Sequence, residues 1–373
     1  MEKDAGNRDN RTVTDEPRRR RLRVLAYTDS TQLGGAERAL SHLLATLDDS
    51  FDVTVLGVSE GIVAAVAGGR KASVVAAPRP ILADVHAFRA HVLALRATGA
   101  DILHANLISP FSCQYAISAA IALRIPSVAV YQLPNTPVNR RQRFLKRLTA
   151  RRTTVHVGVG KRTARQVEEI IGLPPGGVRT IHNGVPDLAV PRPPSRRDGQ
   201  ATIVAVGRLS PQKGFDVLVR ALALVPAASL VLIGQGEEER SLHALTRDVG
   251  VADRVFFRGW LDEPRHLLPS FDIFALPSRL EGFPLSVLEA QLAEVPVVAS
   301  DVGSVAEAVI PERTGVLVPP DNPQALAAAL NALLSDPGKR RRLARAGREL
   351  VLERFTATHM ARGFERLYME IAP

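Results

Sequence analysis

The chain has 373 residues, of which 46% are hydrophobic and 23% charged, and its formal net charge is +10. This length fits two domains of ~150–180 residues each, and the composition is that of a globular enzyme and not of a disordered chain. Aromatic residues make up only 5% of the chain, which argues against a base-stacking surface for single-stranded nucleic acid, and the single cysteine, Cys113, excludes a disulfide framework.

The N-terminal segment carries no membrane or export signal. Residues 1–20 are polar and of mixed charge, they lack the apolar stretch of a secretory signal, and we expect them to form a disordered basic lead. No apolar run in the chain reaches the ~18 residues that a membrane-spanning helix needs. These features favour a cytoplasmic location.

The first structured segment is a predicted strand over residues 22–27, followed by a turn at Gly34-Gly35 and a helix. Four leucines between residues 40 and 47 repeat at helical spacing and give that helix one apolar face. Further strand-like runs follow at residues 52–57, 72–76, 101–104, 127–131 and 178–182. Strands that alternate with helices predict a parallel sheet, and we assign this first domain to residues 21–186.

A change of composition marks a linker. Residues 186–200 contain four prolines, and we assign the linker to residues 187–200. The alternation then restarts, with predicted strands at residues 202–207, 229–234, 254–259, 272–277, 295–300 and 315–318. The chain is therefore predicted to be an α/β protein with two doubly wound, Rossmann-like domains that face each other across a cleft, where such sheets bind ligands.

Two segments of the second domain carry chemistry. The strand over 202–207 ends in Gly207, and Arg208 and Lys213 follow it beside a helix N-terminus, which favours binding of an anion such as a diphosphate. A surface loop with ion pairs would show the same residues.

The second segment follows the strand over 272–277. Glu281 lies in the predicted strand-to-helix turn, Pro284 is placed at the first helical position, and Glu289 lies further along the helix. Carboxylates suit sugars because they accept hydrogen bonds from adjacent hydroxyl groups. A helix-capping carboxylate with an exposed helical glutamate is the alternative.

Together these segments resemble a known family. The patterns GRL-x2-QKG-x-D at residues 207–216, LPS-x2-EGFP-x4-E at 276–289 and PVVASDVGS-x2-E at 296–307 are similar to those of the retaining glycosyltransferases of family 4, which have the GT-B fold. GGAER at residues 34–38 and HNGV at 182–185 extend the resemblance into the first domain. It covers residues 22 to 370.

The resemblance implies a role for each matching residue. Arg208 and Lys213 would hold the donor diphosphate, Glu281 the sugar hydroxyl groups and Glu289 the ribose diol; Arg208, Lys213 and Glu281 are the expected catalytic residues. The complete donor-binding set that it implies is Gly34, Gly35, Gly207, Arg208, Lys213, Arg258, Gly259, Glu281, Gly282, Phe283, Pro284, Leu285 and Glu289. A second domain over residues 201–353 would be followed by a terminal helix over 354–373 that crosses back to the first domain.

The expected reaction moves a hexose-type sugar, from a UDP-sugar first and a GDP-sugar next, to a glycan or lipid-linked acceptor in cell-surface polysaccharide assembly. On the acceptor side, His104 and Asn106 are candidates, although a structural histidine is the alternative for His104. Gln132 stands where many relatives carry a histidine, and it cannot act as a general base. Ser304 replaces the second of two glycines that are common in relatives.

No metal or cofactor is expected. The chain contains no Asp-x-Asp motif and no cluster of cysteine or histidine at ligand spacing. Arg208 and Lys213 would supply the positive charge that Mg²⁺ supplies in other transferases.

The segment over residues 138–152 carries seven basic and no acidic side chains. It predicts an amphipathic helix whose cationic face binds an anionic membrane surface, with a solvated helix face as the alternative. The residues concerned are Arg140, Arg141, Arg143, Lys146, Arg147, Arg151 and Arg152. A nucleic-acid partner is not expected. The rival functions are a non-catalytic GT-B partner subunit, which Gln132 would favour, and a nucleotide-sugar epimerase.

Overall fold

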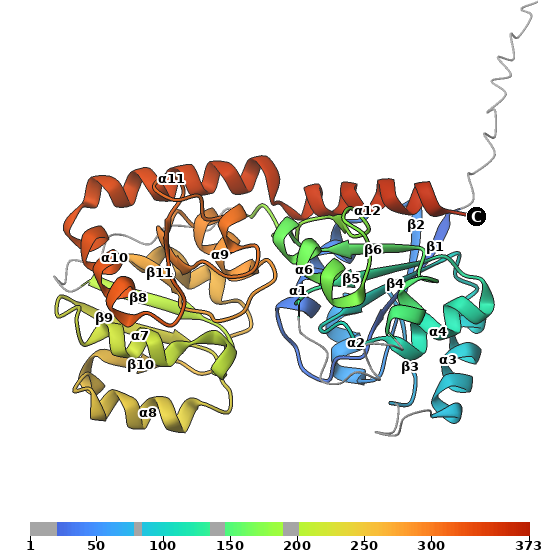
Figure 1. Ribbon diagram of the computed structural model, residues 1–373, viewed down its shortest axis with the longest axis horizontal. Helices are drawn as coiled ribbons and strands as arrows, with labels where there is room; N and C mark the ends of the chain where they lie inside the picture. The colour runs from blue at the N-terminus through green and yellow to red at the C-terminus, as the bar shows by residue number, and fades with distance from the viewer. Residues whose placement is uncertain (1–20, 78–83, 135–145, 189–200) are drawn as a thin grey trace, which may run out of the picture.

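The computed structural model describes residues 21–77, 84–134, 146–188 and 201–373. It contains two α/β domains that stand side by side, each built on its own sheet (Figure 1). The predicted lead over residues 1–20, Arg140, Arg141, Arg143 and most of the predicted linker lie outside the described residues.

The first domain holds a seven-stranded parallel sheet in the order β3-β2-β1-β4-β5-β6-β7. Its strands are β1 (Leu22–Thr28), β2 (Phe51–Gly57), β3 (Lys71–Val74), β4 (Ile102–Leu107), β5 (Ser127–Tyr131), β6 (Val155–Gly158) and β7 (Arg179–Thr180). Its helices are α1 (Gly35–Thr46), α2 (Glu60–Ala67), α3 (Val85–Thr98), α4 (Gln114–Leu123) and α6 (Lys161–Ile171). β4 and β5 are buried along their whole length, as central parallel strands covered on both faces must be.

The second domain holds a six-stranded parallel sheet in the order β10-β9-β8-β11-β12-β13. Its strands are β8 (Ala201–Val206), β9 (Ala228–Ile233), β10 (Val255–Phe257), β11 (Ile273–Leu276), β12 (Val297–Ser300) and β13 (Val316–Val318). Its helices are α7 (Phe215–Leu222), α8 (Glu239–Asp248), α9 (Leu285–Leu292), α10 (Pro323–Ser335) and α11 (Pro337–Arg354). The prediction of two doubly wound, Rossmann-like domains is confirmed.

Both sheets place the predicted site at the point where the strand order reverses. In the first sheet β1 lies between β2 and β4, and in the second β8 lies between β9 and β11. Connections that leave a central strand in opposite directions open a crevice beyond its carboxyl end, which is where doubly wound domains bind ligands. Gly34 follows β1, Gly207 follows β8 and Glu281 follows β11.

The last two helices join the domains. α11 and α12 (Ala357–Ile371) run along one edge of the molecule, α11 over the second domain and α12 over the first (Figure 1). The chain crosses at the HNGV turn, where Val185 N–H donates to Phe355 O over 3.0 Å and Ala357 N–H donates to Val185 O over 2.7 Å. Through this crossing, one continuous apolar cluster extends from Leu40 of α1 to Phe283, Phe355 and Tyr368.

Three local predictions differ from the structure. The predicted strand over 254–259 ends at Phe257, because Gly259 turns the backbone with a φ of 66°. β6 was not predicted. Pro284 is the residue before helix α9 and not its first residue, since its ψ of 120° is extended.

Candidate functional site

The turn between β1 and α1 is the part of the first domain that Arg208 of the second domain approaches. Gly34 donates its backbone N–H to Glu37 Oε2 over 3.0 Å, which gives α1 an acidic cap. Burial raises the pKa of the Glu37 carboxyl, and the Gly34 N–H and the Arg208 guanidinium oppose that rise. A methyl group on Gly34 would lie 3.9 Å from Arg208 Nη2. Arg208 of the second domain therefore reaches the Gly34-Gly35 turn of the first.

Lys213 and Glu281 form an ion pair at the carboxyl ends of β8 and β11. Lys213 Nζ lies 2.6 Å from Glu281 Oε1, and Ser278 Oγ donates to the same oxygen over 2.7 Å. Glu281 is only 4% exposed. The predicted phosphate-binding cation and the predicted sugar-binding carboxylate therefore touch each other, in a setting where their charges are weakly screened.

Glu289 lies on α9 and is partly buried. Burial raises the pKa of its carboxyl, whereas the guanidinium groups of Arg38 and Arg265 lower it. Arg38 belongs to the first domain and Arg265 to the second. The carboxylate predicted to hold the ribose therefore lies in the field of cations from both domains.

Arg38 is a cleft residue to which the sequence motif alone gave no role. Its Nη2 donates to the backbone oxygen of Asp262 over 2.5 Å. Its guanidinium carbon lies 5.5 Å from the centroid of the Trp260 ring, in a cation–π contact. Arg38 therefore joins the GGAER segment to Arg258-Gly259-Trp260, a segment that contains two residues of the predicted donor-binding set.

Three glycines lie at the carboxyl ends of neighbouring strands in the second domain. Gly207, Gly234 and Gly259 follow the ends of β8, β9 and β10, and Gly234 N–H donates to Gly259 O over 2.8 Å. A Cβ on Gly234 would lie 1.9 Å from Gly207 O, so no other residue fits there. Sequence reasoning missed Gly234, although the glycine after each of these three strands was a usable signal.

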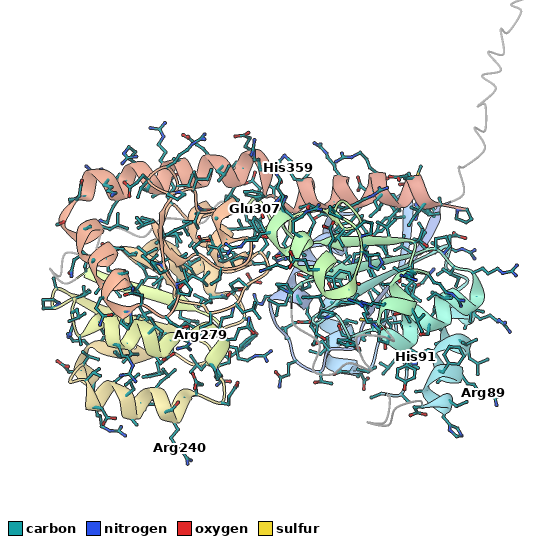
Figure 2. All side chains as sticks on the ribbon, viewed as in Figure 1. Arg89, His91, Arg240, Arg279, Glu307 and His359 are labelled. Carbon is teal, nitrogen blue, oxygen red and sulfur yellow. The ribbon has the colours of Figure 1, made fainter. Side chains whose placement is uncertain are left out.

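The two loops that carry the site are tied together. Gln212 Nε2 donates to Leu280 O over 2.9 Å, and Arg279 N–H donates to Gln212 O over 2.8 Å. The Arg279 guanidinium binds both oxygens of Asp216, at 2.8 and 2.9 Å, on the second domain (Figure 2). Partial burial would raise the pKa of Asp216, but Arg279 lowers it below its usual value. Asp216 thus fixes the GRL-x2-QKG-x-D loop against the next motif.

The start of α9 presents a short apolar turn. Phe283 packs its ring 4.9 Å from Phe355 and 5.0 Å from His182, measured between centroids, and so points into the junction between the domains. Gly282, Pro284 and Leu285 are also buried. Their predicted contribution to donor binding comes from backbone groups at the helix N-terminus.

The acceptor-side candidates Asn106 and Gln132 are joined in one hydrogen-bonded chain. Gln132 Nε2 donates to Asn106 Oδ1 over 2.8 Å, and Asn106 Nδ2 donates to Ala36 O over 3.1 Å. Gln132 Oε1 accepts from Asn183 Nδ2 over 2.9 Å. All three amide side chains are buried. The position of the family histidine is therefore held by an amide whose oxygen and nitrogen are both engaged.

His104 is buried beneath the terminal helix, which agrees with the structural alternative for this residue and not with a role on the acceptor side. β4 continues to Leu107, so His104 lies within the strand, where its Nδ1 shares a 2.6 Å hydrogen bond with Tyr368 Oη of α12. Complete burial lowers its pKa to about 3. His104 is a neutral structural residue beneath the terminal helix.

The basic segment divides into two groups where the structure describes it. Lys146 is 2% exposed and stands over the Tyr131 ring, so its predicted place on a cationic surface is wrong. Arg147, Arg151 and Arg152 are exposed, as is Leu148. Among the described residues, no helix is long and apolar enough to cross a membrane, and no group of three or more His, Cys, Asp or Glu side chains could hold a metal ion.

Two Rossmann-like domains, each built on a parallel sheet, and a terminal helix that crosses from the second domain to the first have the arrangement of the GT-B class of glycosyltransferase folds. Residues 33–187 match the model of glycosyltransferase family 4, and residues 190–350 match the model of glycosyl transferases group 1. The chain belongs to the family 4 glycosyltransferases.

Relatives of known sequence agree with this assignment. An uncharacterized glycosyltransferase of Methanocaldococcus jannaschii is 30% identical over 57% of this chain and 59% of its own length. The lipopolysaccharide core biosynthesis glycosyltransferase LpsE of Rhizobium meliloti is 32% identical over 41% and 45%. A D-inositol 3-phosphate glycosyltransferase of Jonesia denitrificans is 35% identical over 55% and 54%. The chain spans about half the length of the curated relatives that it matches.

Solved structures show the same fold over nearly the whole chain. HepE of Anabaena, in complex with UDP and glucose, superposes with a TM-score of 0.83 at 20% identity and covers 94% of this chain and 100% of its own. The lipopolysaccharide outer core galactosyltransferase WaaB superposes with a TM-score of 0.73 at 20% identity, over 94% and 100%.

Proposed function

We propose that this chain is a retaining glycosyltransferase that moves a hexose-type sugar from a nucleotide-diphosphate donor, UDP-sugar first and GDP-sugar next. The acceptor is a glycan or a lipid-linked sugar of cell-surface polysaccharide assembly. The observation that carries the proposal is the 2.6 Å pair of Lys213 and Glu281, which follow the carboxyl ends of β8 and β11, with Arg208 in the same loop as Lys213. A paired cation and carboxylate match a donor that joins an anionic diphosphate to a sugar rich in hydroxyl groups.

In the proposed reaction, the bond between the anomeric carbon and the diphosphate oxygen breaks as the acceptor oxygen bonds to the same face of that carbon. The acceptor proton passes to the departing diphosphate oxygen. Arg208 and Lys213 stabilise the negative charge that grows on that group. Gln132 has no basic atom, and His104 is buried beneath α12 with a pKa of about 3, so neither residue serves as the base. The proposed route needs no protein base, because the departing diphosphate takes the proton. An NMR spectrum of the first product would show the donor's anomeric configuration, and an inverted product would contradict the proposal.

The first test is a calorimetric titration with UDP, GDP and ADP in metal-free buffer. One nucleotide should bind, and Arg208→Ala should abolish that binding, because the diphosphate loses a fixed charge. Glu289→Ala should weaken the same affinity through lost ribose contacts. Nucleotide binding that is unchanged when EDTA is added would support transfer without a metal cofactor. Nucleotide binding that appears only when Mg²⁺ is added would contradict the proposed independence from metal.

The rival functions give different results in the same experiments. A non-catalytic partner subunit would bind none of the nucleotides and transfer no sugar. A nucleotide-sugar epimerase would bind UDP, but it would convert the sugar nucleotide into its epimer in the absence of any acceptor. The arrangement of Arg208, Lys213 and Glu281 favours transfer, since the two cations would stabilise the negative charge of the departing diphosphate.

We further propose reversible docking to an anionic surface on the inner face of the cell membrane. Arg147, Arg151 and Arg152 are exposed around the exposed Leu148, which suits a lipid headgroup region. Each such cation contributes about 1 kcal/mol near an anionic bilayer. Changing these three arginines to glutamine should release the protein from anionic vesicles, and unchanged partitioning would contradict the proposal.

A further inference from the structure

The loop that carries Glu281 is held by side chains of the other domain. Thr163 Oγ1, on helix α6 of the first domain, donates to Gly282 O over 3.3 Å. Asn183 Nδ2, in the HNGV turn, donates to Phe283 O over 3.4 Å. Thr163 and Asn183 are 0% and 6% exposed. Because water is excluded from these contacts, a lost donor would leave a loop carbonyl partly unsatisfied.

Ser304 of the second domain completes this contact. Its Oγ accepts the Thr163 N–H over 3.0 Å and lies 3.0 Å from Thr163 Oγ1, and its own N–H donates to Gly282 O over 2.9 Å. The residue that precedes α6, Gly160, stands at the N-cap position and has no side chain to cap the helix. Ser304 therefore caps a helix of the first domain from the second domain, and a glycine at position 304 could not.

The close approach of the two domains depends on small residues. A Cβ on Gly160 would lie 2.3 Å from Ser304 Cβ, and a Cβ on Gly282 would lie 1.9 Å from the backbone oxygen of Gln132. Both distances are too short for any side chain. The loop therefore rests directly on the backbone of the first domain.

Gln132 extends this network of contacts to the start of α1 in the first domain. Its Oε1 orients the Asn183 amide at 2.9 Å, and its Nε2 is fixed by Asn106, which in turn donates to Ala36 O at the start of α1. An unbroken series of hydrogen bonds thus runs from the GGAER segment to Phe283 O. Asn106 and Gln132 each use the amide nitrogen as a donor and the amide oxygen as an acceptor, which fixes their orientation, and Asn183 Nδ2 donates to both Gln132 Oε1 and Phe283 O.

We infer that Thr163 and Asn183 are positioning residues, through which the first domain holds the Glu281 loop in the geometry that transfer requires. Gln132 orients Asn183, and Ser304 orients Thr163. The inference rests on the proposed function, in which Glu281 binds the donor sugar. The nucleotide itself meets Arg208, Lys213 and Glu289, so the positioning residues act on turnover and not on nucleotide affinity.

The test compares Thr163→Val, which removes the hydroxyl donor, with Thr163→Ser, which keeps it. Thr163→Val should lower kcat about tenfold, as expected for one lost hydrogen bond to a reacting loop, and leave the UDP dissociation constant within about twofold. Thr163→Ser should retain most of the wild-type kcat. Thr246→Val removes another buried hydroxyl, one that donates to His243 O within α8, and should leave kcat unchanged.

Hydrogen exchange separates this inference from the proposed function. The backbone amides of residues 281–283, 285 and 304 should exchange faster in Thr163→Val and in Ser304→Gly than in the wild type, whether or not a donor sugar has been identified. Ser304→Gly also serves if Thr163→Val does not fold. Wild-type exchange rates in both variants, or a fall in UDP affinity parallel to the fall in kcat, would overturn the inference. A wild-type protein without transfer activity, but with faster loop exchange in the variants, would overturn only the proposed function.

Discussion

The Glu281 carboxylate is almost fully buried, and its hydrogen-bonding partners are Lys213 Nζ and Ser278 Oγ. Lys213→Ala should reduce turnover by ~10²-fold or more, because the charge that it meets grows in the transition state. It should also cost about 3 kcal/mol of folding free energy, since a buried carboxylate is left without its counter-ion.

A second substitution separates these two effects. Adding Glu281→Gln to the Lys213→Ala variant removes the unpaired charge, so urea unfolding should show recovered stability while turnover stays low. Normal turnover in the Lys213→Ala variant would contradict the assignment of this residue. Equal stability of the single and the double variant would show that the pair contributes little to folding.

Lys146 is a second buried cation, but it faces the Tyr131 ring in place of a carboxylate. Burial lowers its pKa from 10.5 to about 8. Below pH 8 the folded protein therefore holds a buried charge, at a cost of about 3 kcal/mol for a shift of this size. Between pH 8 and 10.5 the unfolded chain binds more protons than the folded one, so this cost disappears as the pH rises.

Lys146→Met should accordingly stabilise the protein by about 3 kcal/mol at pH 7, with a smaller gain at pH 10. Urea unfolding of both proteins at the two pH values measures this. Because tyrosines and other lysines of the unfolded chain titrate in the same range, the difference between variant and wild type is the relevant quantity. A gain that does not change with pH would show that Lys146 has the same pKa in the folded and the unfolded chain.

Single residues also set the limit of what could be predicted. The motifs identified Arg208, Lys213, Glu281 and Glu289, whose roles stay predictions. In the structure Lys213 pairs with Glu281, Arg208 approaches Gly34, and Glu289 lies in the field of Arg38 and Arg265. His104 was placed in the cleft because the predicted strand ended three residues early. A partner 264 positions away, Tyr368, decides its role, and strand spacing carries no information about such a partner.

At the scale of elements, helix ends show why some predictions succeed. Asn322 accepts the Ala325 N–H over 2.9 Å, with Pro323 first in α10, so the cap and the proline that start this helix are neighbours in the sequence. The start of α6 could not be predicted in the same way, because its cap comes from Ser304 and Glu307 in the other domain. Local signals determine an element that caps itself, whereas an element capped across a domain junction needs the fold.

Glu307 lies at the junction between the domains (Figure 2), where it accepts from Arg162 N–H over 3.2 Å and pairs with His182 Nε2 at 2.7 Å. Burial would raise the pKa of its carboxyl, but His182 and the N–H groups of Lys161 and Arg162 lower it overall. A lowered pKa contributes stability above the value of the unfolded carboxyl, about 4.3, and this contribution is lost as the pH falls through the folded value.

Glu307→Gln should therefore destabilise the protein by about 1 kcal/mol at pH 7, the size of a helix-capping contact, and have little effect in acid. Thermal unfolding of variant and wild type between pH 7 and pH 3 gives the comparison. Glu349→Gln, at an exposed ion pair on α11, serves as the control and should change little at either pH. An effect of Glu307→Gln that persists unchanged in acid would contradict the role of the ionised carboxylate.

For the whole molecule, the fold predicts that the two domains unfold together. A single apolar cluster contains residues of both sheets, and Phe283, Phe355 and Tyr368 connect its two halves where α11 passes into α12. The hydrogen bonds at Val185 and Thr163 cross the same junction. Domains that share a core and a set of buried hydrogen bonds lose both when either one opens, so their unfolding is coupled.

Calorimetry should therefore give one transition for the wild type, with equal calorimetric and van't Hoff enthalpies. Phe355→Ala removes the ring that touches both Phe283 and His182, at a cost of about 3–5 kcal/mol, and should split the transition in two. Phe256→Ala removes a ring that is 48% exposed and should keep a single transition. Two transitions already present in the wild type would show that the junction is weak, and the positioning of the Glu281 loop would then depend on bound donor to bring the domains together.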